Sequence, residues 1–147
     1  NAQINAANIG THNIRKYKDI DCLVINETEL RHEMRQRGGD AHIMAATLKD
    51  LINIKYMSVT RGREGAFLLN DSNLPVTCPG FATQVVDKIG SGDALLSLLS
   101  ICLFSKIDND LSIFIASIAA SQSVETLGNS VPVSKVILLK TISHYLK

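Results

Sequence analysis

A glycine-rich turn with an acidic residue carries the clearest chemistry in this sequence. Gly90-Ser91-Gly92-Asp93 opens directly onto a long apolar stretch, which predicts a helix from about Gly92 to about Phe104. The first N–H groups of a helix have no intrahelical partner, and the glycines let a ligand approach the backbone closely. Together with the helix dipole, these groups form a site for an anion, most naturally a phosphate. Asp93 is then placed as a base beside a transferring phosphoryl group, or it only stabilises the first turn.

Two other phosphate-binding motifs are excluded by the residues that follow this turn. A Walker loop needs a lysine directly after its last glycine, and Gly92 is followed by Asp93. A dinucleotide fingerprint needs a third glycine, which is absent from Asp93-Ala94-Leu95. A turn that packs tightly and binds nothing remains the alternative.

The second constellation is Asn26-Glu27-Thr28-Glu29. Asn26 ends a predicted strand, and Glu29 lies in the first turn of the predicted helix that follows. A carboxylate at this place could hold Mg²⁺ through water, because magnesium prefers oxygen ligands and keeps several of its waters. The alternative is an N-cap asparagine followed by an acidic first turn.

The third constellation is the turn from Thr60 to Gly65, with the sequence TRGREG. Its glycines could let the backbone pass beneath a nucleotide, and Arg61 or Arg63 could meet a phosphate. The alternative is a hairpin turn whose arginines are solvated.

Alternating strand and helix patterns must position these residues. The periodicity predicts strands at 22–25, 56–60 and 66–69, with short extended pieces at 74–78 and 83–86. It predicts helices at 27–36, from an Asp40 cap to about 52, from 92 to about 104, at 111–124 after an Asn109 or Asp110 cap, and from a Ser134 cap to 145.

This alternation favours an α/β fold, a layered sheet with helices on its faces. Ligands of such sheets collect at the carboxyl ends of the strands. Asn26, Gly62 and the Gly90 turn each follow a predicted strand, so we expect them to gather at one edge.

Composition narrows the classes of function. The 147 residues suit one domain, and 46% hydrophobic with 20% charged residues argue against disorder. A net charge of +1 gives no case for nucleic acid or an anionic membrane, and the apolar run 94–104 is too short to span a bilayer. The three cysteines are widely spaced, which indicates reduced thiols and a cytoplasmic setting. A start without Met suggests a fragment.

In order and spacing, these motifs resemble the carboxyl-terminal half of ribokinase-type (PfkB) carbohydrate kinases. That family carries an NxxE motif, a TxGxxG turn and a DTxG[AS]GD signature. The matching positions are Asn26 and Glu29; Thr60, Gly62 and Gly65; and Asp87, Gly90, Ser91, Gly92 and Asp93. The tail 116–132 resembles the adenine-side helix and loop of the family. The LGNS run at 127–130 makes the chain most similar to the kinases of heptose phosphate.

The resemblance implies a ribokinase-like fold whose amino-terminal half is absent, so that residues 1–147 form one partial domain. It implies an ATP-dependent kinase that transfers the γ-phosphoryl group to a hydroxyl of a sugar or sugar phosphate. Asp93 would be the catalytic base, and Gly90, Ser91 and Gly92 would form the anion hole. The resemblance also implies the binding residues: Asn26 and Glu29 for magnesium and phosphates; Thr60, Gly62 and Gly65 for phosphates and ribose; Ser117, Leu127 and Gly128 for the adenine side; and Asp87 with the 125–130 loop for potassium, if this member uses it.

The chain also departs from the family pattern. Lys88 and Ile89 replace a threonine-like pair, and Ser117 stands where Asn or His is commoner. The missing half supplies the sugar pocket and the lid in this family, so a partner carrying that half is implied. A degenerate module that binds nucleotide or a partner chain without catalysis therefore stays open as the alternative, and so does a homodimer. An NAD-binding Rossmann domain is disfavoured by the absent third glycine.

Overall fold

Four strands form one mixed sheet in the order β1-β2-β3-β4 in the computed structural model, which describes residues 13–17 and 19–147. β1 and β2 are parallel, and β2-β3 and β3-β4 are antiparallel. The strands are β1 (Ile20–Asn26), β2 (Ile54–Thr60), β3 (Ala66–Leu69) and β4 (Val76–Cys78). The predicted hairpin between β2 and β3 is therefore confirmed.

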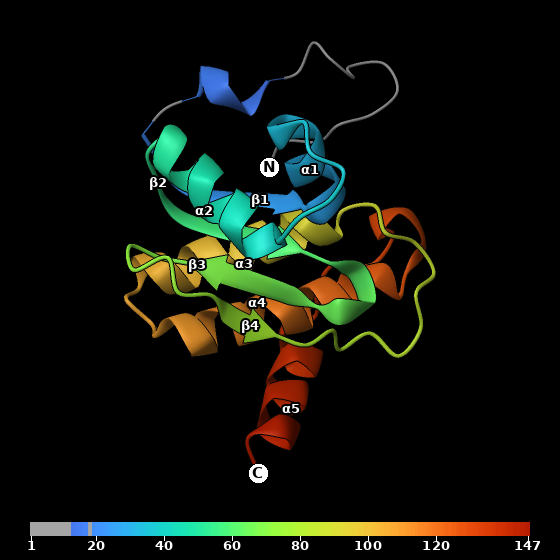
Figure 1. Ribbon diagram of the computed structural model, residues 1–147. Helices are drawn as coiled ribbons and strands as arrows, with labels where there is room; N and C mark the ends of the chain where they lie inside the picture. Colours follow the sequence, from blue (N-terminus) through green and yellow to red (C-terminus); the bar gives the residue numbers. More distant parts are fainter. Residues whose placement is uncertain (1–12, 18) are drawn as a thin grey trace.

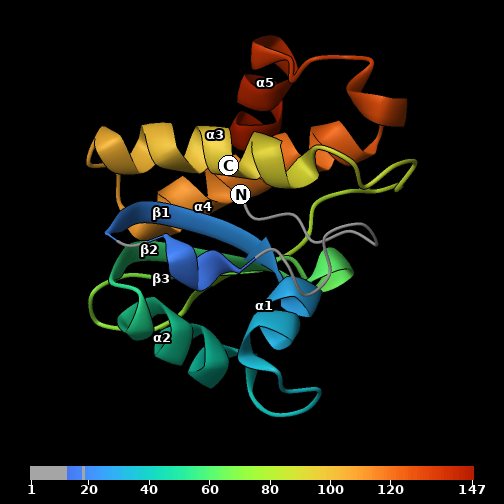
Figure 2. The same cartoon turned by 90° about the horizontal axis from the view of Figure 1, so that it is seen from above.

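Helices cover both faces of this sheet, as Figure 2 shows: α1 and α2 lie on one face, and α3 and α4 lie on the other. α5 extends away from the sheet on the α3/α4 side (Figure 1). The helices are η1 (Ile14–Lys16), α1 (Glu27–Met34), α2 (Ala41–Leu51), η2 (Gly62–Glu64), α3 (Ser91–Phe104), α4 (Asn109–Val124), η3 (Leu127–Asn129) and α5 (Lys135–Tyr145). The prediction of a layered α/β sheet is confirmed.

The core has two halves because successive strand residues point to opposite faces. Odd-numbered residues of β1 to β3, such as Met57 and Phe67, pack with α1 and α2. Most even-numbered apolar residues, such as Val24 and Leu68, pack with α3 and α4, whereas Ile20 and Ile54 at the strand starts join the first group. Burial on both faces explains why the middle of β1 and all of β3 read as continuous apolar runs.

Two predicted helix caps are confirmed. Asp40 accepts hydrogen bonds from the amides of His42 at 2.7 Å and Ile43 at 3.3 Å, and Ser134 accepts one from Ile137 at 3.4 Å. The predicted cap of α4 is wrong, because Asp108 holds the N-cap position instead of Asn109 or Asp110.

The predicted extended piece at 83–86 is not a strand, and this expectation is corrected. The amides of Val86 and Asp87 donate to the carbonyl oxygen of Val124, at 2.8 and 3.1 Å, instead of to a neighbouring strand. The segment is therefore docked against the end of α4.

The cysteines are free thiols, and Cys78 and Cys102 are buried. Burial raises the pKa of Cys22, Cys78 and Cys102 above the ordinary 9.0, so the thiol form dominates at neutral pH. Within residues 13–17 and 19–147, no helix combines the length and hydropathy needed to cross a bilayer.

Candidate active site

The ends of β1 and β2 lie side by side at the carboxyl edge of the sheet. Asn26 and Thr60, the last residues of the two strands, are partners in the parallel ladder. Figure 2 shows the end of β1, the η2 turn and the beginning of α3 at this same edge. The pairing of Asn26 with Thr60 brings the ends of β1 and β2 to one edge as expected, whereas no strand precedes the Gly90 turn.

The glycine-rich turn opens α3 as the sequence predicts, with the helix starting at Ser91. Gly90 is the N-cap residue in the left-handed conformation, with φ 83° and ψ −10°, and it offers no side chain to cap the helix. The Ser91 hydroxyl donates to the carbonyl oxygen of Lys88 at 3.0 Å, which orders the turn. Asp93 is in the first turn of α3 and is exposed. This arrangement presents helical amides and a carboxylate together.

Asn26 and Glu29 form a reciprocal capping box at the start of α1. The amide of Glu29 donates to Asn26 Oδ1 at 2.8 Å, and the amide of Asn26 donates to Glu29 Oε2 at 2.8 Å. Glu29 is 7% exposed. The structure therefore confirms that Asn26 caps α1, with Glu29 in its acidic first turn. No three His, Cys, Asp or Glu side chains come together as a metal site among the residues that the structure describes.

The η2 turn requires its last glycine. Gly65 has φ 88°, and a Cβ at this position would overlap the carbonyl oxygen of Cys78. The turn closes through a hydrogen bond of 2.7 Å from the amide of Arg61 to the carbonyl oxygen of Gly65. The backbone of the TxGxxG motif is thereby packed against the end of β4.

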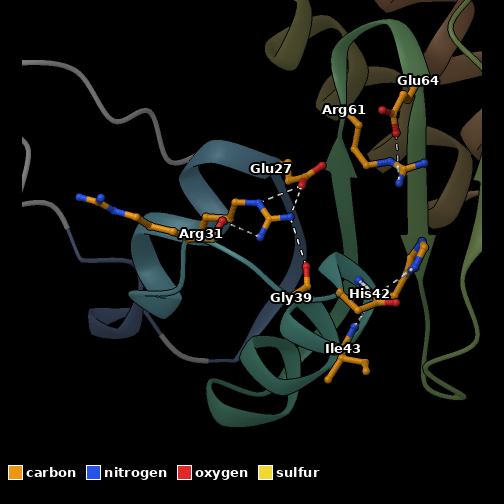
Figure 3. Close-up of polar contacts among 9 residues, drawn as sticks. Glu27, Arg31, Gly39, His42, Ile43, Arg61 and Glu64 are labelled. Atoms are coloured by element: carbon orange, nitrogen blue, oxygen red, sulfur yellow. Dashed lines mark hydrogen bonds and ion pairs between the residues drawn. The ribbon is translucent and has the colours of Figure 1, made fainter.

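The arginines of this turn do not meet the Gly90 turn. Arg61 pairs with Glu64 at 3.4 Å, and its guanidinium lies 5.9 Å from the centroid of the Phe67 ring. Phe67 belongs to the α1/α2 face, where the His42 ring lies 4.3 Å from it. Figure 3 shows Arg61 directed toward His42, so Arg61 points away from the face that carries α3. Arg63 is exposed.

Asp87 joins the loop before α3 to the segment after α4. Its Oδ1 accepts from the amide of Ile89 at 3.0 Å, and its Oδ2 accepts from the amide of Gly128 at 2.9 Å. These amides of Ile89 and Gly128 hold the pKa of the Asp87 carboxyl below its ordinary value of 3.8. Nearby, Glu125 Oε1 accepts from the Thr83 amide at 3.3 Å and the Thr83 hydroxyl at 3.2 Å. The resemblance points to the 125–130 loop, but no local pattern indicates the pairing of Glu125 with Thr83, which lies 42 positions earlier.

The adenine-side residues suggested by the resemblance fall in two places. Leu127 and Gly128 are exposed in η3, next to Asp87. Ser117 is buried in α4 at 7% exposure, and its hydroxyl lowers the pKa of the Cys78 thiol against the larger effect of burial. Ser117 is seven residues from the end of α4 at Val124, which is roughly 10 Å along the helix axis.

Known proteins resemble this chain in sequence and in fold. Residues 10–136 match the family described as pfkB family carbohydrate kinase. The Bifunctional protein HldE of Geotalea uraniireducens is 31% identical over 133 residues, which cover 88% of this chain and 27% of the relative. The chain spans a quarter or less of the length of some other HldE relatives, and 20% of that from Campylobacter fetus.

Solved structures agree with this result. Phosphofructokinase-2 from Escherichia coli in complex with potassium superposes with a TM-score of 0.76 at 14% identity, over 88% of this chain and 42% of that chain. Arabidopsis thaliana ribokinase complexed with ribose and ATP superposes with a TM-score of 0.72 at 26% identity, over 84% of this chain and 41% of that chain. The fold is thus the ribokinase-like fold, covered in part, and the chain belongs to the pfkB family of carbohydrate kinases.

Proposed function

We propose that this chain is the nucleotide-binding and catalytic half of an ATP-dependent kinase that phosphorylates a hydroxyl of a sugar or sugar phosphate. The observation that supports this most is the start of α3. Gly90 in the left-handed conformation begins α3 with no capping side chain, so that the first helical amides lie in the same turn as Asp93, and Figure 2 shows this turn at the edge where β1 ends. A helix N-terminus with this geometry suits a phosphate.

The chemistry follows from those groups. The amides of Gly90, Ser91 and Gly92 would hold the γ-phosphate and stabilise the negative charge that develops on it. The hydroxyl oxygen of the sugar attacks the γ-phosphorus while the bond to the bridging oxygen of ADP breaks. Asp93 accepts the proton that the hydroxyl loses.

Further residues would position the nucleotide. Thr60, Gly62 and Gly65 would line the phosphates and ribose, and Leu127 with Gly128 would lie on the adenine side. Magnesium would neutralise phosphate charge, and Asn26 with Glu29 would hold it through water, because Mg²⁺ keeps most of its hydration shell beside substrate phosphates. Ser117 would contribute to the adenine side through the packing of α4, because its side chain is buried.

The residues that choose the sugar would come from an amino-terminal half. β1 is an edge strand of the four-stranded sheet. The helix α3 packs on β1, and its side chains Ile101 and Phe104 are 61% and 90% exposed. These features support packing of the second half against β1 and α3. We place the whole enzyme in the cytoplasm, where ATP is available and the three thiols stay reduced.

A module that binds nucleotide without transferring phosphate is the second candidate. It is favoured by the extent of the structural match, which covers 42% of the chain of Escherichia coli phosphofructokinase-2. Calorimetric titration with Mg-ATP, Mg-ADP and NAD, followed by an ADP-release assay with sugars and sugar phosphates in a protein that carries both halves of the kinase, separates the candidates. Binding of ATP with release of ADP supports the kinase. Binding without release supports the module, and tight binding of NAD alone would overturn both.

A further inference from the structure

The junction between the loop before α3 and the end of α4 is closed by hydrogen bonds within the protein. Both oxygens of the Asp87 carboxylate accept main-chain amides, from Ile89 at 3.0 Å and from Gly128 at 2.9 Å. The second of these bonds spans 41 residues. It therefore fixes η3 relative to the turn that leads into Gly90.

Three carbonyl oxygens at this junction also accept hydrogen bonds. The carbonyl oxygen of Val124 accepts two amides, from Val86 and Asp87, at 2.8 and 3.1 Å. The carbonyl oxygen of Lys88 accepts the Ser91 hydroxyl at 3.0 Å. The carbonyl oxygen of Leu127 accepts the amide of Ser130 at 3.0 Å. The amide and hydroxyl donors thus direct positive partial charge at these three carbonyl oxygens and at the Asp87 carboxylate.

A potassium ion needs a different arrangement. Proteins bind K⁺ by several oxygens that converge and replace its hydration shell. At this junction the carboxylate faces amide hydrogens, and Lys88 adds a positive charge one residue away. The residues present therefore do not fit a monovalent cation.

We propose that Asp87 is a positioning residue that ties the anion-binding turn directly to Gly128, so that this site is ordered without a monovalent cation. The expected effect on nucleotide binding rests on the proposed function. The hydrogen bond between Asp87 and Gly128 does not depend on that function. Since Gly128 lies on the expected adenine side and Gly90 on the phosphate side, the link sets the distance between the two ends of the nucleotide site.

Salt exchange at constant ionic strength tests the proposal on the unmodified chain. The Kd for Mg-ATP is measured in KCl, NaCl and tetramethylammonium chloride. We expect the same Kd within about twofold in all three salts, because the amides already occupy the carboxylate. Tightening by about tenfold in KCl alone would overturn the proposal.

Variants at Asp87 test the positioning role. Asp87→Ala should weaken Mg-ATP binding by about tenfold, because a hydrogen bond to a charged group is lost on the adenine side. Asp87→Asn keeps one acceptor oxygen and should recover part of this loss in every salt. Asp110→Asn, in the first turn of α4, is the matched control and should bind as the unmodified chain does. Unchanged binding by Asp87→Ala would contradict the role.

Hydrogen exchange separates this proposal from the proposed function. The Gly128 and Ile89 amides should exchange several-fold faster in Asp87→Ala than in the unmodified chain, and KCl should leave the unmodified rates unchanged. Equal exchange in both proteins, or slower exchange on adding KCl, would contradict the link. If no nucleotide binds in any salt, the proposed function fails, and the exchange rates still decide whether Asp87 holds Gly128.

Discussion

Asn26 and Thr60 are paired in register as the last residues of the parallel strands β1 and β2. This pairing brings the NxxE and TxGxxG motifs together, although 34 positions separate the two residues in the sequence. Because strand side chains alternate, a shift of one residue would turn Thr60 to the opposite face of the sheet. The register of two buried strands therefore helps to build the candidate site.

The capping box predicts a stability effect that does not depend on metal. Asn26→Ala removes the acceptor for the amide of Glu29 and should lower the free energy of unfolding by about 1 kcal/mol. Urea denaturation in EDTA and in MgCl₂ measures this loss, which should be the same in both. A loss seen only with magnesium would show that the pair acts mainly as a metal site.

Glu29→Gln separates the capping role from the proposed magnesium role. Glutamine serves in a capping box as glutamate does, so stability should be nearly unchanged. The loss of a negative charge should weaken Mg-ATP binding several-fold while leaving the binding of metal-free ATP unchanged. If the affinity for Mg-ATP also stays unchanged, Glu29 does not help to hold magnesium.

Gly65→Ala should destabilise the protein by about 3 kcal/mol, since the new methyl group meets the Cys78 carbonyl and the backbone has positive φ. Gly62→Ala is the matched control. Gly62 also has positive φ, at 59°, but no atom lies within 4 Å of its added Cβ, so the cost should be about 1 kcal/mol. Chemical denaturation compares the two, and equal losses would contradict the packing of η2 against β4.

Asp93→Asn should nearly abolish phosphoryl transfer and leave the affinity for ATP within about threefold, because a base acts on the reacting proton and adds little to nucleotide binding. The assay is ADP release in a protein that carries both halves of the kinase, together with calorimetric titration of ATP. A parallel loss of rate and affinity would contradict the assignment of Asp93 as base.

Acid should weaken the fold through Asp87. Its pKa is lowered in the folded protein, from 3.8, by the amides of Ile89 and Gly128. A carboxyl with a lowered pKa contributes stability above its unfolded pKa, and this contribution is lost as pH falls through the folded pKa. Urea midpoints should therefore fall less steeply below about pH 4 in Asp87→Asn than in the unmodified chain. Identical acid profiles would show that the carboxylate adds nothing to stability.

Local signals predicted much of the fold. The apolar run Ala66–Leu69 between turn residues gave β3 with its observed bounds, and Asp40 gave the start of α2. The bounds of β3 and the start of α2 depend on residues that are close in the sequence, so a local pattern predicts them. Asn26 and Gly90 were placed correctly for the same reason, since each stands at the boundary of an element.

Long-range contacts account for the features that the sequence did not predict. Residues 83–86 resemble a strand because Val85 and Val86 are β-branched, but their segment docks on Val124 instead. The helix α1 ends at Met34 and not at residue 36, because Arg35 takes a left-handed conformation with φ 54°. This conformation is uncommon for residues other than glycine, so the sequence does not predict it. The burial of Ser117 under β4 and the orientation of Arg61 toward Phe67 depend on tertiary packing.

Calorimetric titration of Mg-ATP into the unmodified chain and into Gly92→Val tests the phosphate site most directly. Gly92 is the second residue of α3, where valine is tolerated by a helix, so the variant should remain folded by circular dichroism. We expect the unmodified chain to bind Mg-ATP and the valine side chain to weaken this binding by about tenfold or more, because it blocks the approach to the first amides. Equal affinity of the two folded proteins would contradict a phosphate site at the start of α3.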